Sequence, residues 1–181
     1  MYIDLPWVDP HMAKAYKITS DPFFVNGSIT ESGANTYTQA EISLPLDSLN
    51  QEGVLVHAVY FTSTEPERVV NSKTVCALQV SSTSKTDIVG ANDANLIARR
   101  QLILTGGAAE FSGPHIIDLI GQDAPYTEAD NLMIVATDNV FFAIKGDNNT
   151  GAMQGQFRMV CSRVKLDAAA YAALVTNELT N

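Results

Sequence analysis

The feature of this sequence that most limits its fold is a succession of short β-prone runs separated by turn residues. Residues 54–61 are nearly all apolar, as expected of a strand that is buried on both faces or central in a sandwich. Residues 140–144 and 154–164 flank a loop of glycine, asparagine and aspartate, which is the clearest hairpin signal in the chain. The other runs are 23–25, 36–44, 73–81, 100–105, 115–120 and 131–136.

The loops between these runs indicate how the strands connect. They are uneven in length, whereas an up-and-down meander has mostly tight links, and no convincing helix interrupts the series. The pattern therefore predicts an all-β fold, a jelly-roll (Greek-key) β-sandwich of about eight antiparallel strands with a short C-terminal helix.

That helix is expected after Asp167, whose side-chain oxygen can cap the first turn of an alanine-rich segment. Tyr171, Leu174, Val175 and Leu179 recur at helical spacing on one side of it. A helix of about 12 residues does not persist alone in water, so it must pack on something. Its own sandwich is the default partner, and an adjacent subunit is the alternative.

The N-terminal segment is apolar and contains two prolines, which favours an extended arm. The arm either lies along the domain or reaches across to a neighbour. The sequence thus divides into an arm (1–20), a jelly-roll sandwich (21–166) and a helix (167–181). Candidate subunit-contact residues are those of the arm and the helix: Tyr2, Ile3, Leu5, Trp7, Tyr171, Leu174, Val175 and Leu179.

Composition excludes several classes of protein. With 181 residues, 46% hydrophobic and 17% charged, the chain is expected to be one folded domain and not a disordered tail, a collagen-like fibre or a coiled coil. The net charge of −9 leaves few basic residues, and the only adjacent pair is Arg99-Arg100, so direct binding of nucleic acid is not expected. No apolar run is long enough to span a bilayer, and no signal-peptide pattern begins the sequence.

The cysteine and histidine residues, which are common in catalytic sites, do not lie in a pattern that indicates catalysis. Cys76 and Cys161 each lie inside an expected strand and are expected to be buried free thiols. His57 lies in the most apolar run, which favours a hydrogen-bonded structural histidine over a catalytic base. His115 and Asp118 are three apart on a strand and point to opposite faces. We therefore expect no enzyme activity, no catalytic residue, no metal and no cofactor.

The polar loops are expected to be turns. Residues 106–107 lack the lysine or third glycine of a phosphate-binding loop. Residues 147–149 offer oxygen ligands without the spacing of an EF-hand, so a plain hairpin is favoured over calcium. Residues 26–28 and 148–150 match the N-glycosylation sequon and are read as chance matches in turns. The aromatic residues fall mostly within strand runs, so they do not discriminate a sugar-binding site from a core. A further polar loop contains Asp87, Asp93 and Asn95, and there too a plain turn is favoured over a calcium site.

With its strand series, uneven loops, apolar arm and C-terminal helix, the chain resembles the single jelly-roll capsid proteins of icosahedral viruses. It departs from the branch that packages nucleic acid through an Arg/Lys-rich arm, because its own arm is not basic. The resemblance is therefore closer to the tailless viruses whose jelly-roll shell encloses an internal membrane. Cupin enzymes share the fold, but their metal-binding histidine pairs have no counterpart here.

The resemblance implies a self-assembling structural subunit of an icosahedral viral capsid, located in the virion. Its partners would be copies of itself and other capsid proteins, near an internal membrane and without direct contact to nucleic acid. A carbohydrate- or receptor-binding β-sandwich, such as a spike or fibre head, is the alternative from a different class. A cupin- or lyase-like enzyme is a third interpretation.

Overall fold

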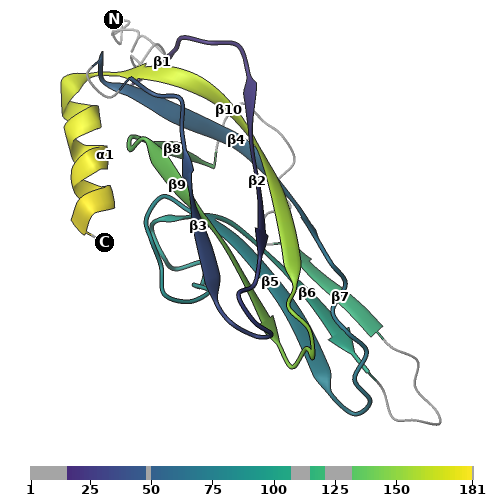
Figure 1. Cartoon of the computed structure of the whole chain (residues 1–181). Helices are drawn as coiled ribbons and strands as arrows, with labels where there is room; N and C mark the ends of the chain where they lie inside the picture. Colours follow the sequence, from purple (N-terminus) through teal and green to yellow (C-terminus); the bar gives the residue numbers. More distant parts are fainter. Residues whose placement is uncertain (1–15, 48–49, 107–114, 121–131, 181) are drawn as a thin grey trace, which may run out of the picture.

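The protein is an all-β sandwich with one helix at its C-terminal end (Figure 1). The structure is a computed structural model that describes residues 16–47, 50–106, 115–120 and 132–180. Within these residues two five-stranded antiparallel sheets face each other. The elements are β1 (Tyr16–Ile18), β2 (Phe23–Thr30), β3 (Thr38–Ser43), β4 (Glu52–Ser63), β5 (Lys73–Ser81), β6 (Leu96–Thr105), β7 (His115–Ile120), β8 (Met133–Val135), β9 (Asn139–Asp147), β10 (Gln154–Leu166) and α1 (Ala168–Thr180).

The strand order is that of a jelly roll, which confirms the predicted fold class. One sheet runs β2-β10-β4-β8, with the short β1 pairing with the same β10. The other runs β3-β9-β5-β6, with β7 added at its edge. From β2 to β5 and again from β8 to β10, successive strands alternate between the sheets, so that two Greek keys interlock. The strands β1 and β7 are additions to the eight of the jelly roll.

Two of the expected segments, the N-terminal arm and the C-terminal helix, can be compared with the structure. Residues 16–18, which the sequence pattern assigned to the arm, form β1 and pair with residues 164–166 of β10. The rest of the expected arm, up to residue 15, lies outside the described residues. The helix α1 lies within the segment expected to be helical, and the side chain of Asp167 caps it by accepting a hydrogen bond from the N–H of Ala170 at 2.7 Å.

The main core fills the space between the sheets. Phe142 of β9 lies at its centre, fully buried, with its ring centroid 4.7 Å from that of Phe157 and 6.4 Å from that of Phe61. Leu78, Ile144 and Met159 are also buried there. Burying each such side chain contributes about 1.5–3 kcal/mol, so this layer supplies most of the stability.

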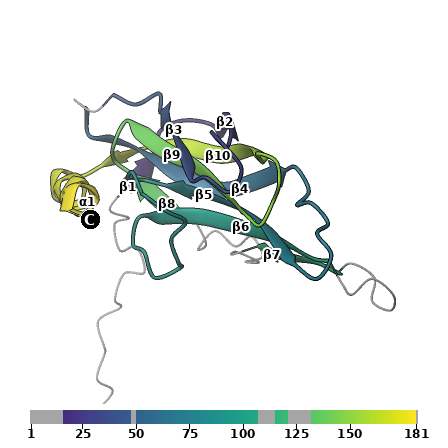
Figure 2. The same cartoon turned by 60° about the horizontal axis from the view of Figure 1, so that its bottom comes forward.

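A second, smaller core lies on the other face of the first sheet, beneath α1. Val54 and Val56 point into the main core, so Leu55 between them points the opposite way, and it is 1% exposed. It packs with Val164 and Leu166 of β10. This explains why the run 54–61 is so apolar: its first part is buried on both faces. Figure 2 shows α1 at this end of the sandwich. The partly buried residues that cover the small core are Tyr16, Ile134, Ala170, Tyr171 and Leu174.

The interpretation of residues 26–28 as a turn is wrong. Strand β2 continues through Asn26 and Gly27 to Thr30 and pairs with β10 along its whole length. The physical reason is packing: a Cβ on Gly27 would lie 2.3 Å from Cε1 of Phe157. Glycine stands here to admit an aromatic ring of the core, which is a known use of glycine inside a strand.

Candidate functional site

Strands β2, β10 and β4 present an open hollow on the face of their sheet that points away from the main core. The cross-strand register builds it row by row: Arg158 of β10 lies between Asn26 of β2 and Tyr60 of β4. In the next row outward-facing Gln156 lies between Ser28 and Thr62. The hollow has a volume of about 600 Å³ and is shallow and open. Its lining residues are Asn26, Gly27, Ser28, Tyr60, Thr62, Gln156, Phe157 and Arg158.

The charged group of the hollow is held in place by its neighbours. The Nε of Arg158 donates a hydrogen bond to Oδ1 of Asn26 at 3.1 Å. Its guanidinium carbon lies 5.4 Å from the centroid of the Phe24 ring, which is a cation–π distance. Among the described residues, the two terminal nitrogens of Arg158 have no partner. They can therefore take an anion.

The rest of the lining supplies unused polar groups and an aromatic surface. The side chains of Ser28, Thr62 and Gln156 are exposed and have no hydrogen-bond partner in the described part of the chain. Tyr60 is 56% exposed and Phe24 60%, unusual values for large aromatic side chains on strands. A guanidinium, an amide, hydroxyls and an exposed ring together suit a polar ligand with a flat apolar face.

The subunit-contact candidates fall into two groups. Tyr171 and Leu174 pack against the small core of their own chain, Val175 is half-buried, and Leu179 lies in the last turns of α1. The helix is thus packed on its own sandwich, the default of the two expected partners. The arm candidates, Tyr2, Ile3, Leu5 and Trp7, lie outside the described residues.

His57 and the two cysteines lie on the central strands of the two sheets. The Nε2 of His57 lies 2.9 Å from Oγ of Ser162 on the neighbouring β10, beside a register shift between the two strands. Cys76 and Cys161 are buried and free, as expected. Burial raises the pKa of Cys76 to about 11 and that of Cys161 to about 12, so both stay protonated at neutral pH. His115 and Asp118 lie on β7.

No group of three or more His, Cys, Asp or Glu side chains is placed to hold a metal ion, within the residues that the structure describes. No helix in this described part is long and apolar enough to cross a membrane.

The β9–β10 loop, weighed above as a hairpin turn or a calcium site, is braced by protein groups. Its buried Asn149 donates to the carbonyl of Val75 at 2.8 Å and accepts from the N–H of Glu67 at 3.1 Å. The carboxylate of Glu67 in turn accepts from the N–H groups of Thr150 and Gly151 at 2.9 and 3.1 Å. These bonds brace the loop through its N–H groups and the side chain of Asn149.

A second carboxylate, Glu31, holds the two strands on either side of this loop. It is 4% exposed and accepts hydrogen bonds from the backbone N–H of Gly146 and of Met153, the latter at 2.8 Å. Sequence reasoning missed Glu31 and Glu67, because both precede the loop by more than eighty residues.

The other polar loop, residues 82–95, is held by ion pairs. Lys145 Nζ lies 2.9 Å from Asp87, and Lys85 Nζ lies 2.9 Å from Asp93. Beneath the loop Gln79 is fully buried and exchanges hydrogen bonds with its backbone at Asp87 and Val89. The loop therefore covers the outer side of β5.

The hollow could not be found from the sequence. Its residues come from three strands and lie as far apart as 26 and 158. The available signal was the alternation Gln154, Gln156, Arg158, which marks one polar face of a strand without saying what lies beside it.

No family model and no curated protein matches this chain. Among solved structures it is similar to a chain of Desmodium yellow mottle tymovirus, with 11% sequence identity and a TM-score of 0.26, over 84% of this chain and 94% of the other. At this TM-score and identity the similarity carries no inference about function.

Proposed function

We propose that this protein is a structural, self-assembling subunit of an icosahedral viral capsid. The observation that carries the proposal is a sheet edge, β7, that has no strand on its outer side among the residues that the structure describes. In the described part of the chain β7 pairs with β6 alone, and four of its six residues are isoleucine or leucine. Ile117 in its middle is 47% exposed. An apolar edge strand whose outer N–H and C=O groups have no strand beside them is a template for pairing with another chain.

The opposite edge of the same sheet is protected. There β3 carries a charged Glu41 and a polar, exposed Ser43, and its sequence TQAEIS has one large apolar residue. Soluble proteins blunt their edges in this way to prevent association. The contrast between the two edges of one sheet supports a specific use for β7.

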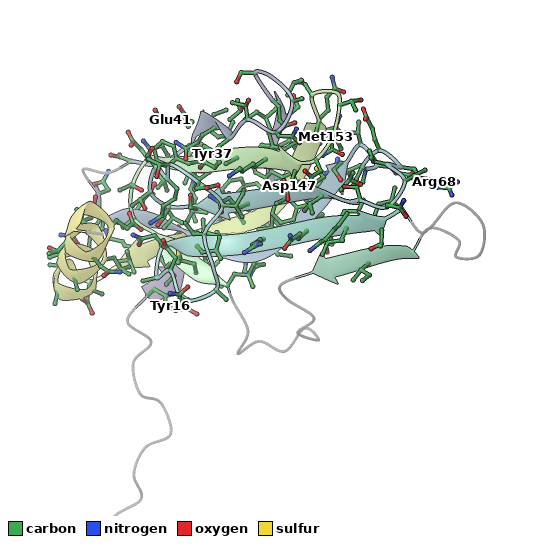
Figure 3. All side chains as sticks on the ribbon, turned by 90° about the horizontal axis from the view of Figure 1, so that it is seen from below. Tyr16, Tyr37, Glu41, Arg68, Asp147 and Met153 are labelled. Carbon is green, nitrogen blue, oxygen red and sulfur yellow. The ribbon has the colours of Figure 1, made fainter. Side chains whose placement is uncertain are left out.

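Antiparallel pairing of β7 with β7 of a second copy would join two sandwiches across a two-fold axis. A two-fold contact by itself closes at a dimer, so a shell requires further, different contacts. Exposed apolar residues away from β7 could provide them: Ile18 on β1 and Val70 between β4 and β5 are each 50% exposed. Figure 3 shows the ends of the sandwich on which these segments lie, marked by the labels of Tyr16 and Arg68.

The partners we propose are copies of this chain and other capsid proteins, and the location is the virion. The net charge of −9 disfavours direct contact with a genome. The adjacent basic pair is also used internally, since Arg99 donates to the carbonyl of Val89 at 2.9 Å and Arg100 to that of Phe61. A shell around an internal membrane would not require this chain to neutralise nucleic acid.

The test is the assembly state of the purified protein, measured by light scattering, sedimentation velocity and electron microscopy over a range of concentration and salt. We expect concentration-dependent particles. Ile117→Lys places a charge on the edge and should weaken association at least about tenfold, and Ser43→Lys is the matched control on the protected edge. A monomer under every condition, or equal effects of the two variants, would overturn the proposal.

A further inference from the structure

We propose that the hollow on β2, β10 and β4 binds a carboxylated saccharide, a use that is independent of shell assembly. Four observations carry this inference: the local charge, the free end of Arg158, the exposed ring of Tyr60, and the unused polar groups beside them.

The charge of the hollow is opposite to that of the protein. The chain has twenty acidic and eleven basic residues, yet the lining of the hollow, as far as the described residues form it, contains Arg158 and no carboxylate. An anionic group is therefore favoured here, on a molecule whose overall field repels anions. We therefore expect a ligand whose negative charge is confined to one group that Arg158 can bind, because the net negative charge of the protein would repel a more extended anion.

The geometry of Arg158 favours a carboxylate. Asn26 holds Nε, and the ring of Phe24 lies 5.4 Å from the guanidinium carbon, so the group is oriented before a ligand arrives. The two terminal nitrogens then present a planar pair of donors, which matches the two oxygens of a carboxylate. Because the guanidinium is already oriented, less conformational entropy is lost when the ligand binds.

The remaining groups favour a sugar ring. Tyr60 lies directly across from Arg158 in the β4–β10 register, and its exposed side chain offers a flat surface for the apolar face of a pyranose. In the next row Ser28, Gln156 and Thr62 offer hydroxyl and amide groups, which can both donate to and accept from sugar hydroxyls. The volume of about 600 Å³ lies within the range of small-molecule sites.

Sialic and uronic acids share this chemistry, and the experiment separates them. Binding of the folded full chain would be measured by calorimetry and saturation-transfer NMR with sialyllactose, a glucuronate-containing disaccharide, neutral lactose and an acidic peptide. We expect one carboxylated sugar to bind at least about tenfold more tightly than lactose, as a charge-assisted hydrogen-bond pair predicts. The acidic peptide should not compete.

The variants assign the binding to the hollow. Arg158→Gln should weaken the carboxylated sugar about tenfold or more and leave the weak binding of lactose unchanged. Tyr60→Ala should weaken both sugars. Arg68→Gln removes the same charge from an exposed position outside the hollow and should change neither. Near-UV circular dichroism of each variant would check that it is folded.

Three results would overturn the proposal: no binding of either acid at concentrations up to about 10 mM, which corresponds to less than about 3 kcal/mol of binding free energy; equal binding of the acidic peptide; or binding that survives Tyr60→Ala and Arg158→Gln. Because every measurement uses ligand binding and none uses particle formation, failure here is distinguishable from failure of the assembly proposal.

Discussion

Glu178, near the end of α1, accepts a hydrogen bond at 3.1 Å from the backbone N–H of Ala136, which follows β8. Its second oxygen accepts from the N–H of Thr137 at 3.1 Å. Glu178 is 6% exposed and Ala136 2%, so the bond ties the far end of the helix to the sandwich in a place that water hardly reaches. The helix thus has two fixed points, its cap at Asp167 and this contact.

Removing the carboxylate should release the end of the helix. In Glu178→Ala the N–H groups of Ala136 and Thr137 lose their acceptor. The N–H of Ala136 is buried, and leaving one buried donor unpaired costs about 1–3 kcal/mol, whereas water can reach the partly exposed Thr137. We expect a loss of about 1–3 kcal/mol in the free energy of unfolding, measured by urea denaturation. Glu65→Ala, which removes an exposed carboxylate elsewhere in the chain, is the control and should change stability by less than about 0.5 kcal/mol. Equal stability of wild type and Glu178→Ala would show that the contact is not needed.

The same residue predicts a pH dependence. Burial raises the pKa of Glu178 above its ordinary value, although the N–H groups of Ala136 and Thr137 act in the opposite direction. The folded state therefore binds this proton more tightly than the unfolded state, and the associated stability is present below the unfolded pKa and is lost as pH rises through the folded pKa. Glu178→Gln cannot ionise. The free energy of unfolding of wild type, relative to that of Glu178→Gln, should decrease as pH rises above about 4.3, the ordinary pKa of a glutamate, and through the raised folded pKa. A difference in free energy of unfolding between the two proteins that does not change with pH would contradict this prediction.

The contribution of Glu67 to stability should have the opposite pH dependence to that of Glu178. The hydroxyl and the N–H of Thr150, together with the N–H of Gly151, lower the pKa of Glu67 below its ordinary value. Its contribution is therefore present above the unfolded pKa and lost as pH falls through the folded pKa. At neutral pH Glu67→Gln should have a lower Tm than wild type, and the gap should close in acid. The exposed Glu65→Gln is the control, expected to follow wild type at every pH.

The glycine inside β2 gives a packing prediction. In Gly27→Ala the new methyl would lie 2.3 Å from Cε1 of Phe157, so the core must shift, and we expect a loss of about 1–3 kcal/mol in the free energy of unfolding. Adding Phe157→Leu should recover part of that loss, because the smaller side chain makes room. The coupling between the two changes is read from a double-mutant cycle. Gly33→Ala, whose Cβ would meet nothing nearer than 3.5 Å, should be close to neutral.

The two thiols should be unreactive in the folded protein. Burial raises the pKa of Cys76 to about 11 and that of Cys161 to about 12, and only the thiolate attacks a disulfide reagent. With Ellman's reagent at about pH 8 we expect no fast reaction of the native protein and two thiols after denaturation. Rapid titration of either thiol without denaturant would contradict the burial of these strands.

The local pattern of the sequence was sufficient for the fold class and for most of the strands. Short runs with a period of two, separated by turn residues, place side chains on alternate faces. The run 54–61 is nearly all apolar because its first part has a core on each side. Asp167 was likewise recognisable as a helix cap, since capping depends on neighbours within one turn.

Tertiary structure alone decided what depends on strand pairing. The sequence shows that Gln156 and Arg158 share a face, but only the register sets them beside Ser28, Asn26, Tyr60 and Thr62 and leaves a hollow there. It also places glycine against an aromatic ring at position 27, where an Asn-Gly pair reads locally as a turn. The rows of the hollow are set by contacts between residues 94 to 132 positions apart, and no local preference encodes which distant strand will lie alongside.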